Sequence, residues 1–391
     1  MNEKFAAPMT DADTTSTDAF LFSGLRIGLV GPLPPPSGGM ANQTRQLAEL
    51  LGTAGALVTL IQVNAPYTPA WAGKIKGVRA LFRLLPYLAH LWQASQTVDL
   101  FHIMANSGWS WHLYAAPAIW IAWLRGKPVV INYRGGEAAN FLSRSWLWVK
   151  PSLKRTQAII VPSGFLRHVF EEFGVEAKIV PNIINLERFS WRSRSVKKNT
   201  APHIIVTRNL EPIYDVATAI RAFLRVSSKI PAANLTIAGS GPERDSLEKL
   251  VAELDLLDRV RFTGRLENEA MAALYQQADL MVNSSLIDNM PNSVLEALAS
   301  NVPVVSTNVG GVPFLVEHGH HALLVPPQDP DAMASAMLVL LENADMTRQF
   351  GENGLELVCQ YAWPQVCGKL FAVYQDVLNK HVTDTVTSQH R

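Results

Sequence analysis

The chain has few cysteines, almost no net charge and no long apolar run, and each shortage excludes a class of protein. Only two of its 391 residues are cysteines, Cys359 and Cys367, and they form no CxxC pair. We therefore expect no disulfide framework, no cysteine-rich zinc site and no redox centre. The low cysteine content suits a protein of the reducing cytoplasm. The net charge of +1, from 34 basic and 33 acidic residues, argues against a dedicated nucleic-acid-binding protein.

Signals for export and for membrane insertion are also missing. The first 20 residues are small, polar and acidic, without the basic start and apolar stretch of a secretory signal. The apolar stretches 80–92 and 113–124 are shorter than the roughly 20 residues that span a bilayer. A buried helix is the default interpretation of both stretches. The first stretch follows Lys74, Lys76 and Arg79, so it is also suited to a membrane surface.

Charge is divided unevenly along the chain. Residues 1–23 carry a net charge of −3, residues 24–200 of +13 and residues 201–391 of −9. A basic front half and an acidic back half indicate that the two halves meet different partners, although a chance scatter of solvated charges would look the same. The length, with 48% hydrophobic residues, is ample for two domains with separate cores.

Short apolar runs alternate with segments of helical spacing. Strands are predicted at 25–32, 57–63, 99–104, 128–133 and 158–163, and again at 203–209, 235–242, 260–264, 279–285 and 302–308. Two such series predict an α/β fold of two Rossmann-like, doubly wound domains facing a ligand-binding cleft. We predict a disordered tail at 1–23, domains at 24–190 and 203–360, a linker at 191–202, a helix at 361–378 that packs back on the first domain, and a tail at 379–391.

A glycine-rich loop, PLPPPSGGM at 32–40, separates the first strand from the helical segment 41–51. Gly38 and Gly39 would let backbone N–H groups approach an anion at the start of that helix. The loop has neither GxGxxG nor GxxxxGK[ST] spacing, so neither a dinucleotide enzyme nor a P-loop NTPase is supported. A tight turn that requires glycine is the alternative interpretation.

A second group of polar residues lies in SSLIDNMPNSVLEALASNVPVVSTNVGGVP, at 284–313. Asp288 falls in the loop after a predicted strand, and a helix begins near Pro291 or Asn292. The free N–H groups at a helix start suit hydroxyl and phosphate oxygens. Glu296, one or two turns into the helix, can accept two hydrogen bonds from a vicinal diol such as ribose. The alternative makes Asp288 a loop cap and Glu296 a surface residue.

Several segments together resemble glycosyltransferase family 4, the retaining nucleotide-sugar transferases of GT-B fold. Asp288, seven residues, Glu296 and LEALASNVPVVSTNVGG match the family's paired acidic residues and its "LEAxAxGxPVVxTxxGG" run. The further matching segments are IAGSGPERDSLEKL, RVRFTGRLENEAMAALYQQADLMVNSS, IIVPSGFLRHVF, VPNIINLERF and the glycine loop at 38–39. The resemblance covers most of the chain.

The resemblance implies a role for each matching residue. Glu296 would bind the ribose, Asp288 would contact the transferred sugar, and Arg208 would stabilise the diphosphate as its charge develops. The donor site would also include Gly38, Gly39, Asn289, Met290, Pro291 and Asn292. The first domain would bind the acceptor, with His102, Arg134 and Gly135 as candidates, although His102 also suits a buried core position. No metal or other cofactor is expected.

Three positions depart from the family pattern. Asp288 stands where the family usually has Glu, and is one methylene shorter. Tyr214 lies near the position of a lysine that contacts the diphosphate, so one cationic contact is lost or replaced from elsewhere. Arg134 follows a strand where many members have histidine; a guanidinium can bind phosphate but is a poor base.

The expected protein is a retaining glycosyltransferase that moves a hexose from a nucleotide sugar to a glycan or a lipid-diphosphate-linked acceptor in polysaccharide biosynthesis. It would work in the cytoplasm or at the inner face of the cytoplasmic membrane. At the membrane, its basic first domain would contact the lipid surface. The three departures leave open a non-catalytic GT-B scaffold or sugar-nucleotide-binding protein of a polysaccharide assembly complex. A nucleotide-sugar epimerase of the same fold is a lesser alternative.

Overall fold

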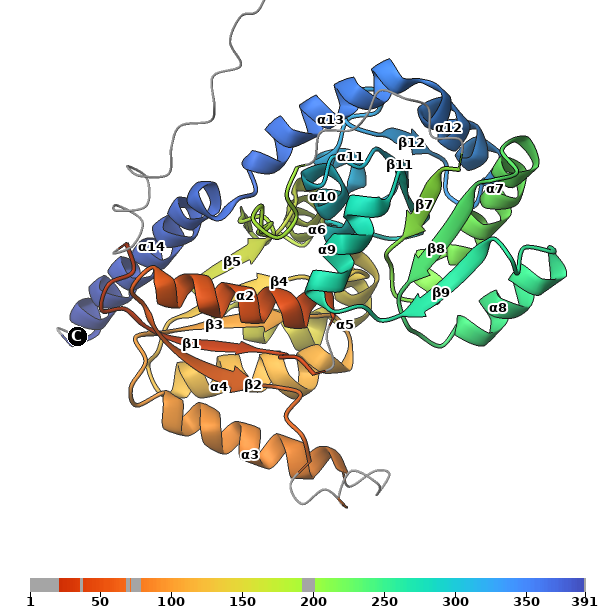
Figure 1. Ribbon diagram of the computed structural model, residues 1–391. Helices are drawn as coiled ribbons and strands as arrows, with labels where there is room; N and C mark the ends of the chain where they lie inside the picture. Colours follow the sequence, from red (N-terminus) through yellow and green to blue (C-terminus); the bar gives the residue numbers. More distant parts are fainter. Residues whose placement is uncertain (1–20, 36–37, 68–70, 72–78, 192–200, 390–391) are drawn as a thin grey trace, which may run out of the picture. The chain divides into compact units, whose positions relative to one another are not determined.

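The structure is a computed structural model that describes residues 21–35, 38–67, 71, 79–191 and 201–389 (Figure 1). Residues 1–20 of the predicted tail, the basic flank at 74 and 76, and most of the predicted linker lie outside the described residues. The chain divides into two compact units, which are described one at a time. Unit 1 comprises described residues within Met1–Val161, Phe173–Val180 and Trp363–Arg391, and unit 2 comprises Pro162–Glu172 and described residues within Pro181–Ala362.

Unit 1 is built on a six-stranded parallel sheet with the order β2-β1-β3-β4-β5-β6. The strands are β1 (Arg26–Gly31), β2 (Leu57–Gln62), β3 (Leu100–Ala105), β4 (Val129–Tyr133), β5 (Ala158–Val161) and β6 (Lys178–Ile179). Its helices are α2 (Gly39–Thr53), α3 (Arg79–Ala94), η2 (Trp111–Ala115), α4 (Ala116–Leu124), α5 (Ala138–Leu153) and α14 (Trp363–Gln389). Every residue of β3 and β4 is buried, as expected for central strands covered on both faces.

The last helix, α14, belongs to unit 1. Phe22 lies against its aromatic side chains Trp363, Phe371 and Tyr374, with ring centroids 6.1, 5.3 and 5.9 Å apart. The helix continues to Gln389, so the tail predicted from residue 379 is helical instead. No glycine or proline in 379–389 ends the helix, which explains the extra length.

Unit 2 has a second six-stranded parallel sheet, in the order β12-β11-β10-β7-β8-β9. The strands are β7 (His203–Val206), β8 (Asn234–Ala238), β9 (Val260–Gly264), β10 (Leu280–Asn283), β11 (Val304–Thr307) and β12 (Leu323–Val325). Its helices are α6 (Gly164–Glu172), η3 (Pro212–Tyr214), α7 (Val216–Lys229), α8 (Arg244–Glu253), α9 (Asn268–Gln277), α10 (Asn292–Ala299), α11 (Val312–Leu315), α12 (Pro330–Glu342) and α13 (Ala344–Cys359). The two parallel sheets confirm the predicted α/β fold class.

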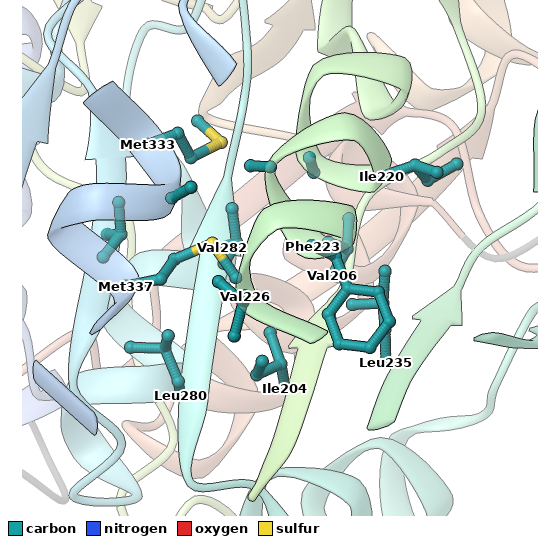
Figure 2. Close-up of a cluster of buried hydrophobic side chains, with 14 of the residues drawn as sticks. Ile204, Val206, Ile220, Phe223, Val226, Leu235, Leu280, Val282, Met333 and Met337 are labelled. Atoms are coloured by element: carbon teal, nitrogen blue, oxygen red, sulfur yellow. The ribbon is translucent and has the colours of Figure 1, made fainter. Parts of the chain in front are cut away.

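Helices α7 and α12 close one core of unit 2 against its sheet (Figure 2). Ala219, Phe223 and Val226 recur at intervals of four and three, which places them on one face of α7. Figure 2 shows α7 side chains beside Met333 and Met337 of α12, over the apolar strand residues. Burying a side chain such as Phe223 contributes about 1.5–3 kcal/mol, and this packing holds the strands in register.

Unit 2 begins earlier in the chain than residue 203. Ile184 and Phe189 are buried in its second core cluster, and the Ile184 N–H donates to the Tyr361 carbonyl over 3.0 Å. These apolar contacts explain why residues 181–190 cluster with unit 2, although the predicted first domain extended to 190. The short edge strands β6 and β12 were not predicted from the sequence, because two or three residues carry no readable period.

Each sheet reverses its strand order once. In unit 1 the reversal lies between β1 and β3, and in unit 2 between β7 and β10. Open α/β sheets bind ligands outside the carboxyl ends of their strands at such a point. The candidate sites are therefore the loops after β1, β3 and β4 in unit 1, and the loops after β7 and β10 in unit 2.

Candidate active site

The carboxyl edge of the unit 2 sheet brings together a cation and an anion at the point of strand reversal. Arg208 follows β7, and Asp288 lies in the loop that follows β10. The Arg208 Nη2 donates to Asp288 Oδ2 over 2.6 Å, and the two side chains are only 12% and 8% exposed. Burial raises the pKa of Asp288, while the Arg208 charge and a hydrogen bond from Ser285 oppose the rise. The structure thus places two of the predicted site residues in direct contact.

Tyr214 holds the other side of the same guanidinium. Its ring lies under Arg208, with 4.0 Å from the guanidinium carbon to the ring centroid. A cation over an aromatic face is stabilised by the ring quadrupole. The Nε of Arg208 is buried and has no hydrogen-bond partner in the described part of the chain. Tyr214 therefore helps to orient Arg208, whose Nε has no hydrogen-bond partner among the described residues.

Glu296 lies on α10, next to a tyrosine that the sequence analysis did not single out. Glu296 Oε2 is 3.1 Å from the Tyr275 hydroxyl, which is also 2.6 Å from Thr207 Oγ1 and 3.1 Å from the Ser293 carbonyl. The hydrogen bond from the Tyr275 hydroxyl favours the ionised carboxylate and lowers the pKa of Glu296. Burial raises the pKa of Glu296 to about 7. The carboxylate is poised to change its charge near neutral pH.

Glycines set the position of the Asp288 loop. A Cβ on Gly311 would lie 1.7 Å from the Asn289 carbonyl oxygen, and one on Gly310 would lie 2.2 Å from the Asp288 carbonyl oxygen. The Gly311 N–H donates to that Asp288 oxygen over 2.8 Å. The close backbone approach leaves no room for a side chain, which explains the Gly-Gly pair of the NVGG segment.

Glycines support the Arg208 loop in the same way. A Cβ on Gly239 would lie 2.0 Å from the Arg208 carbonyl oxygen, and one on Gly241 would lie 2.2 Å from the Leu210 carbonyl oxygen. The GSG of IAGSGP thus packs directly against the backbone that carries the cation. The two glycine pairs fix both sides of the Arg208–Asp288 contact.

Helix α10 begins beside this loop without a side-chain cap. Pro291 is its N-cap residue, and Asn292 begins the helix, as predicted. Asn289 and Met290 are buried in the approach, only 6% and 7% exposed. Asn182, from the VPN segment, donates to the Met290 carbonyl over 3.2 Å and to Asn292 Oδ1 over 2.7 Å. Asn182 is a supporting residue that the sequence analysis missed; its only signal was its place in a matching segment.

Unit 1 has its own polar group at the carboxyl edge of its sheet. Arg134 follows β4, and its Nη1 donates to Gln43 Oε1 on α2 over 3.4 Å. Burial lowers the pKa of Arg134 to about 10, which leaves it charged at neutral pH. A Cβ on Gly135 would lie 2.1 Å from Ser107 Oγ, so glycine is required where this turn meets the loop after β3. His102 is fully buried on β3, away from any exposed surface.

The glycine loop after β1 shows a different pattern. Gly38 has an extended backbone, with φ of −173°, and it precedes the first turn of α2. Nothing described lies within 4 Å of a Cβ built on Gly38 or Gly39. Neither backbone strain nor packing among the described residues requires glycine here, which speaks against the tight-turn alternative. The close approach of a ligand to both glycines stays a prediction.

The described residues contain neither a metal-binding cluster nor a membrane-spanning helix. No three His, Cys, Asp or Glu side chains gather in the described ranges as a metal site would need. Among the helices that are described, none has the length and apolar character to cross a bilayer.

Two family models match the chain side by side. The model of glycosyltransferase family 4 matches residues 37–188, and that of glycosyl transferases group 1 matches residues 187–357. N-acetyl-α-D-glucosaminyl L-malate synthase of Bacillus anthracis is 32% identical over 227 residues, 58% of each protein. Phosphatidyl-myo-inositol mannosyltransferase of Mycolicibacterium smegmatis is 24% identical over 376 residues, 90% of this chain and 94% of that protein. The match thus spans little more than half of the first relative.

Solved structures share the two-domain fold. Sucrose-phosphate synthase of Thermosynechococcus elongatus superposes with a TM-score of 0.68 at 22% identity, over 91% of this chain and all of that one. Anabaena Alr3699/HepE, solved in complex with UDP, has a TM-score of 0.64 at 18% identity, over 93% of this chain and all of that one. Together the two family models extend from residue 37 to residue 357, and the chain belongs to family 4 of the glycosyltransferases, with two α/β domains of the GT-B type.

Proposed function

We propose that this protein is a retaining glycosyltransferase that moves a hexose from a nucleotide-sugar donor to a glycan or a lipid-linked acceptor. The observation that carries the proposal is the group formed by Arg208, Asp288 and Glu296 at the carboxyl edge of unit 2. It offers one cation for a diphosphate and two carboxylates for sugar hydroxyls. Family membership supports the reaction class, and a neighbour of the same fold was solved with UDP.

Each residue has a distinct part in the proposed reaction. Glu296 accepts hydrogen bonds from the ribose hydroxyls, and Asp288 accepts them from the transferred sugar. Arg208 stabilises the charge that develops on the diphosphate as the bond from the sugar C1 to the phosphate oxygen breaks. The acceptor hydroxyl oxygen then bonds C1 on the same face, and its proton passes to the leaving phosphate oxygen. The buried Nε of Arg208 is the donor that a phosphate oxygen would engage.

A thermal-shift panel tests the donor site. UDP, GDP, ADP and their common sugar conjugates are added one at a time, with EDTA present, because we propose that binding requires no metal or other cofactor. A ligand that binds only the folded protein raises its melting temperature. We expect one nucleotide to raise it in the wild type and in Glu269→Ala, a control at an exposed position on α9, and not in Glu296→Ala. A shift that survives Glu296→Ala refutes the assignment of the site.

Turnover separates the proposed enzyme from a binding protein. The nucleotide sugar identified by the panel is incubated with lipid-diphosphate and oligosaccharide acceptors, and the glycoside product is examined by NMR. We expect a product whose anomeric configuration equals that of the donor. Binding without any turnover would instead indicate a sugar-nucleotide-binding scaffold of a polysaccharide assembly complex.

We further propose that the protein acts in polysaccharide biosynthesis in the cytoplasm, in peripheral contact with the inner face of the membrane. Leu81, Leu85 and Trp92 are 51%, 61% and 47% exposed along α3, spaced as one helical face. Such a face on a basic domain suits an anionic lipid surface.

Vesicle co-sedimentation tests the membrane contact. We expect the protein to sediment with vesicles that contain phosphatidylglycerol more than with neutral vesicles. Leu85→Ser should weaken the binding, while Leu257→Ser, a control at a 67% exposed leucine of unit 2, should leave it unchanged. Equal loss in both variants, or no sedimentation at all, refutes the contact through α3.

A further inference from the structure

An exposed tryptophan lies at the carboxyl edge of the unit 1 sheet. Trp109 comes shortly after the end of β3, at the start of the helical segment that continues through η2 into α4, and it is 78% exposed. The sheet reverses its strand order between β1 and β3, so the turn after β3 lies where such a sheet binds ligands. The exposed Trp92, Trp123 and Trp148 lie instead on α3, α4 and α5. Trp109 thus places a large aromatic surface where the topology predicts a ligand.

The turn before Trp109 is held by contacts on both sides. Gly108 has a left-handed backbone, with φ of +69°, a conformation that favours glycine. The Ser107 hydroxyl is 2.8 Å from the hydroxyl of Tyr133, the last residue of β4. The Trp111 N–H donates to the Gly108 carbonyl over 3.1 Å. The turn is therefore tied to the neighbouring strand and to the helix that follows, which fixes the backbone that carries Trp109.

A second tryptophan of the same turn has the opposite surroundings. Trp111 begins the π-helix η2, a form of helix that is frequent at functional sites. Its side chain is fully buried, with its ring centroid 6.2 Å from those of both Tyr133 and Phe141. Trp111 therefore anchors the segment in the core, while Trp109 stays outside it. A large aromatic side chain in water forgoes the free energy of burial, which is recovered when a ligand covers the ring.

The chemistry around Trp109 indicates what kind of ligand fits. Its ring meets the His112 ring edge to face, with centroids 6.3 Å apart and planes at 71°, and most of the indole surface stays open. Asn106, Ser110 and His112 are half-buried polar side chains close to it in the chain. A pyranose ring has an apolar C–H face for the indole and hydroxyls at its edge for such polar groups. An acyl chain would cover these polar groups without giving them partners, which is costly.

We propose that Trp109 stacks on a pyranose ring of the acceptor and so determines which acceptors are used. The proposal rests on the proposed function, in which the first domain binds the acceptor. It narrows that function, because the acceptor must then present a sugar ring to this edge of the sheet rather than a bare lipid. An indole suits the task, since it offers a large, rigid contact surface at a small cost in side-chain entropy. Trp109 takes no part in bond making, and its effect is on acceptor binding.

Two substitutions of Trp109 separate stacking from a general apolar contact. Trp109→Leu keeps an apolar side chain but removes the flat ring, and we expect kcat/KM for a saccharide acceptor to fall roughly 5- to 30-fold, as for a tryptophan at the centre of a binding site. Trp109→Phe keeps a smaller flat ring and should lose less. The KM for the donor should not change in either variant. Wild-type acceptor kinetics in Trp109→Leu would show that no ring stacks there and would overturn the proposal.

Trp148→Leu is the matched control. Trp148 is 77% exposed, almost the same as Trp109, and belongs to the same unit, but it lies in α5 rather than in the turn after β3. Both side chains are mostly in water, so neither leucine variant should change the melting temperature appreciably. Only Trp109→Leu should lower acceptor kcat/KM. An equal kinetic loss in Trp148→Leu would refute a site specific to the turn after β3.

A ¹⁹F NMR titration detects sugar binding without any turnover. The full chain is labelled with 5-fluorotryptophan, and the resonances of Trp109 and Trp148 are assigned from their phenylalanine variants. The probes are the methyl glycosides of glucose, galactose, mannose and N-acetylglucosamine, with dihexanoylphosphatidylglycerol as the lipid probe. We expect at least one glycoside to shift the Trp109 resonance and to leave that of Trp148 unchanged.

The outcomes of this titration are distinct from a failure of the proposed function. A Trp109 shift with the lipid and with none of the glycosides would overturn the proposal in favour of a lipid contact. No shift with any probe would overturn it as well. Protein that binds a nucleotide without turnover would remove the proposed function, while the glycoside titration still decides whether Trp109 binds a sugar ring.

Discussion

The charge of Glu296 should control donor binding near neutral pH. Burial raises the pKa of this carboxyl to about 7, so its ionised fraction rises from about one tenth at pH 6 to about nine tenths at pH 8. The ionised carboxylate can accept a hydrogen bond from each of the two ribose hydroxyls. In the protonated form one carboxyl oxygen carries a proton and acts as a donor, so the carboxyl group accepts less well. If only the ionised form binds, donor affinity should increase roughly tenfold between pH 6 and pH 8.

Isothermal titration calorimetry with the intact nucleotide sugar measures this dependence. The sugar conjugate is preferable to the free diphosphate, because a terminal phosphate also titrates with a pKa of about 6. The Glu296→Gln variant should bind weakly and with a flat pH profile. Tyr275→Phe removes a hydrogen bond that lowers the carboxyl pKa, so the rise in affinity should move to higher pH. A flat profile in the wild type, or an unchanged slope in the glutamine variant, would contradict the assigned role of Glu296.

Three further predictions follow from contacts in the two units. Tyr214→Ala should lower kcat/KM by roughly 2- to 30-fold, the equivalent of an aromatic–cation contact of about 0.5–2 kcal/mol, while Tyr214→Phe should stay near the wild type in steady-state kinetics. Gly311→Ala should lower the free energy of unfolding by roughly 2–3 kcal/mol in urea titrations, because its Cβ meets a backbone carbonyl, whereas Gly38→Ala should leave stability unchanged and reduce turnover. His102 has a lowered pKa in the folded protein, so the unfolded chain takes up the proton first. The free energy of unfolding, measured by urea titration, should therefore fall as the pH drops from about 6.5 toward 3. The fall should be steeper than in His102→Gln, by up to about 1.4 kcal/mol per pH unit.

The alternation of apolar runs and helical spacing was enough to predict both sheets. Buried parallel strands such as β3 and β4 are continuous apolar runs, and such runs are legible in a single sequence. The short strands β6 and β12 were missed, because they owe their pairing to neighbouring strands rather than to their own pattern. The extent of α14 was also missed, since helix ends are set by tertiary packing where no glycine or proline marks them.

The residues of the candidate site that could be predicted from the sequence are those that lie close together along the chain. Asp288 lies in a loop and Glu296 lies in the helix that directly follows it, so their spacing predicted a common site. Tyr275 and Asn182 were not predictable in this way, because each reaches the site from a distant element through side-chain hydrogen bonds. Their contribution depends on the fold bringing α9 and the VPN segment to the start of α10.

The departures at Asp288 and Tyr214 are not independent of each other. In sequence they are two separate losses, a shortened carboxylate and a missing cation, 74 residues apart. In the structure both contact one guanidinium: the tyrosine ring lies against a face of Arg208, and the carboxylate binds its edge over 2.6 Å. The ring covers one face of the Arg208 guanidinium, and the hydrogen-bonding atoms of an arginine all lie along its edge. The tyrosine therefore helps to hold this guanidinium against the carboxylate, so that a change at either position has to be judged by what it does to Arg208.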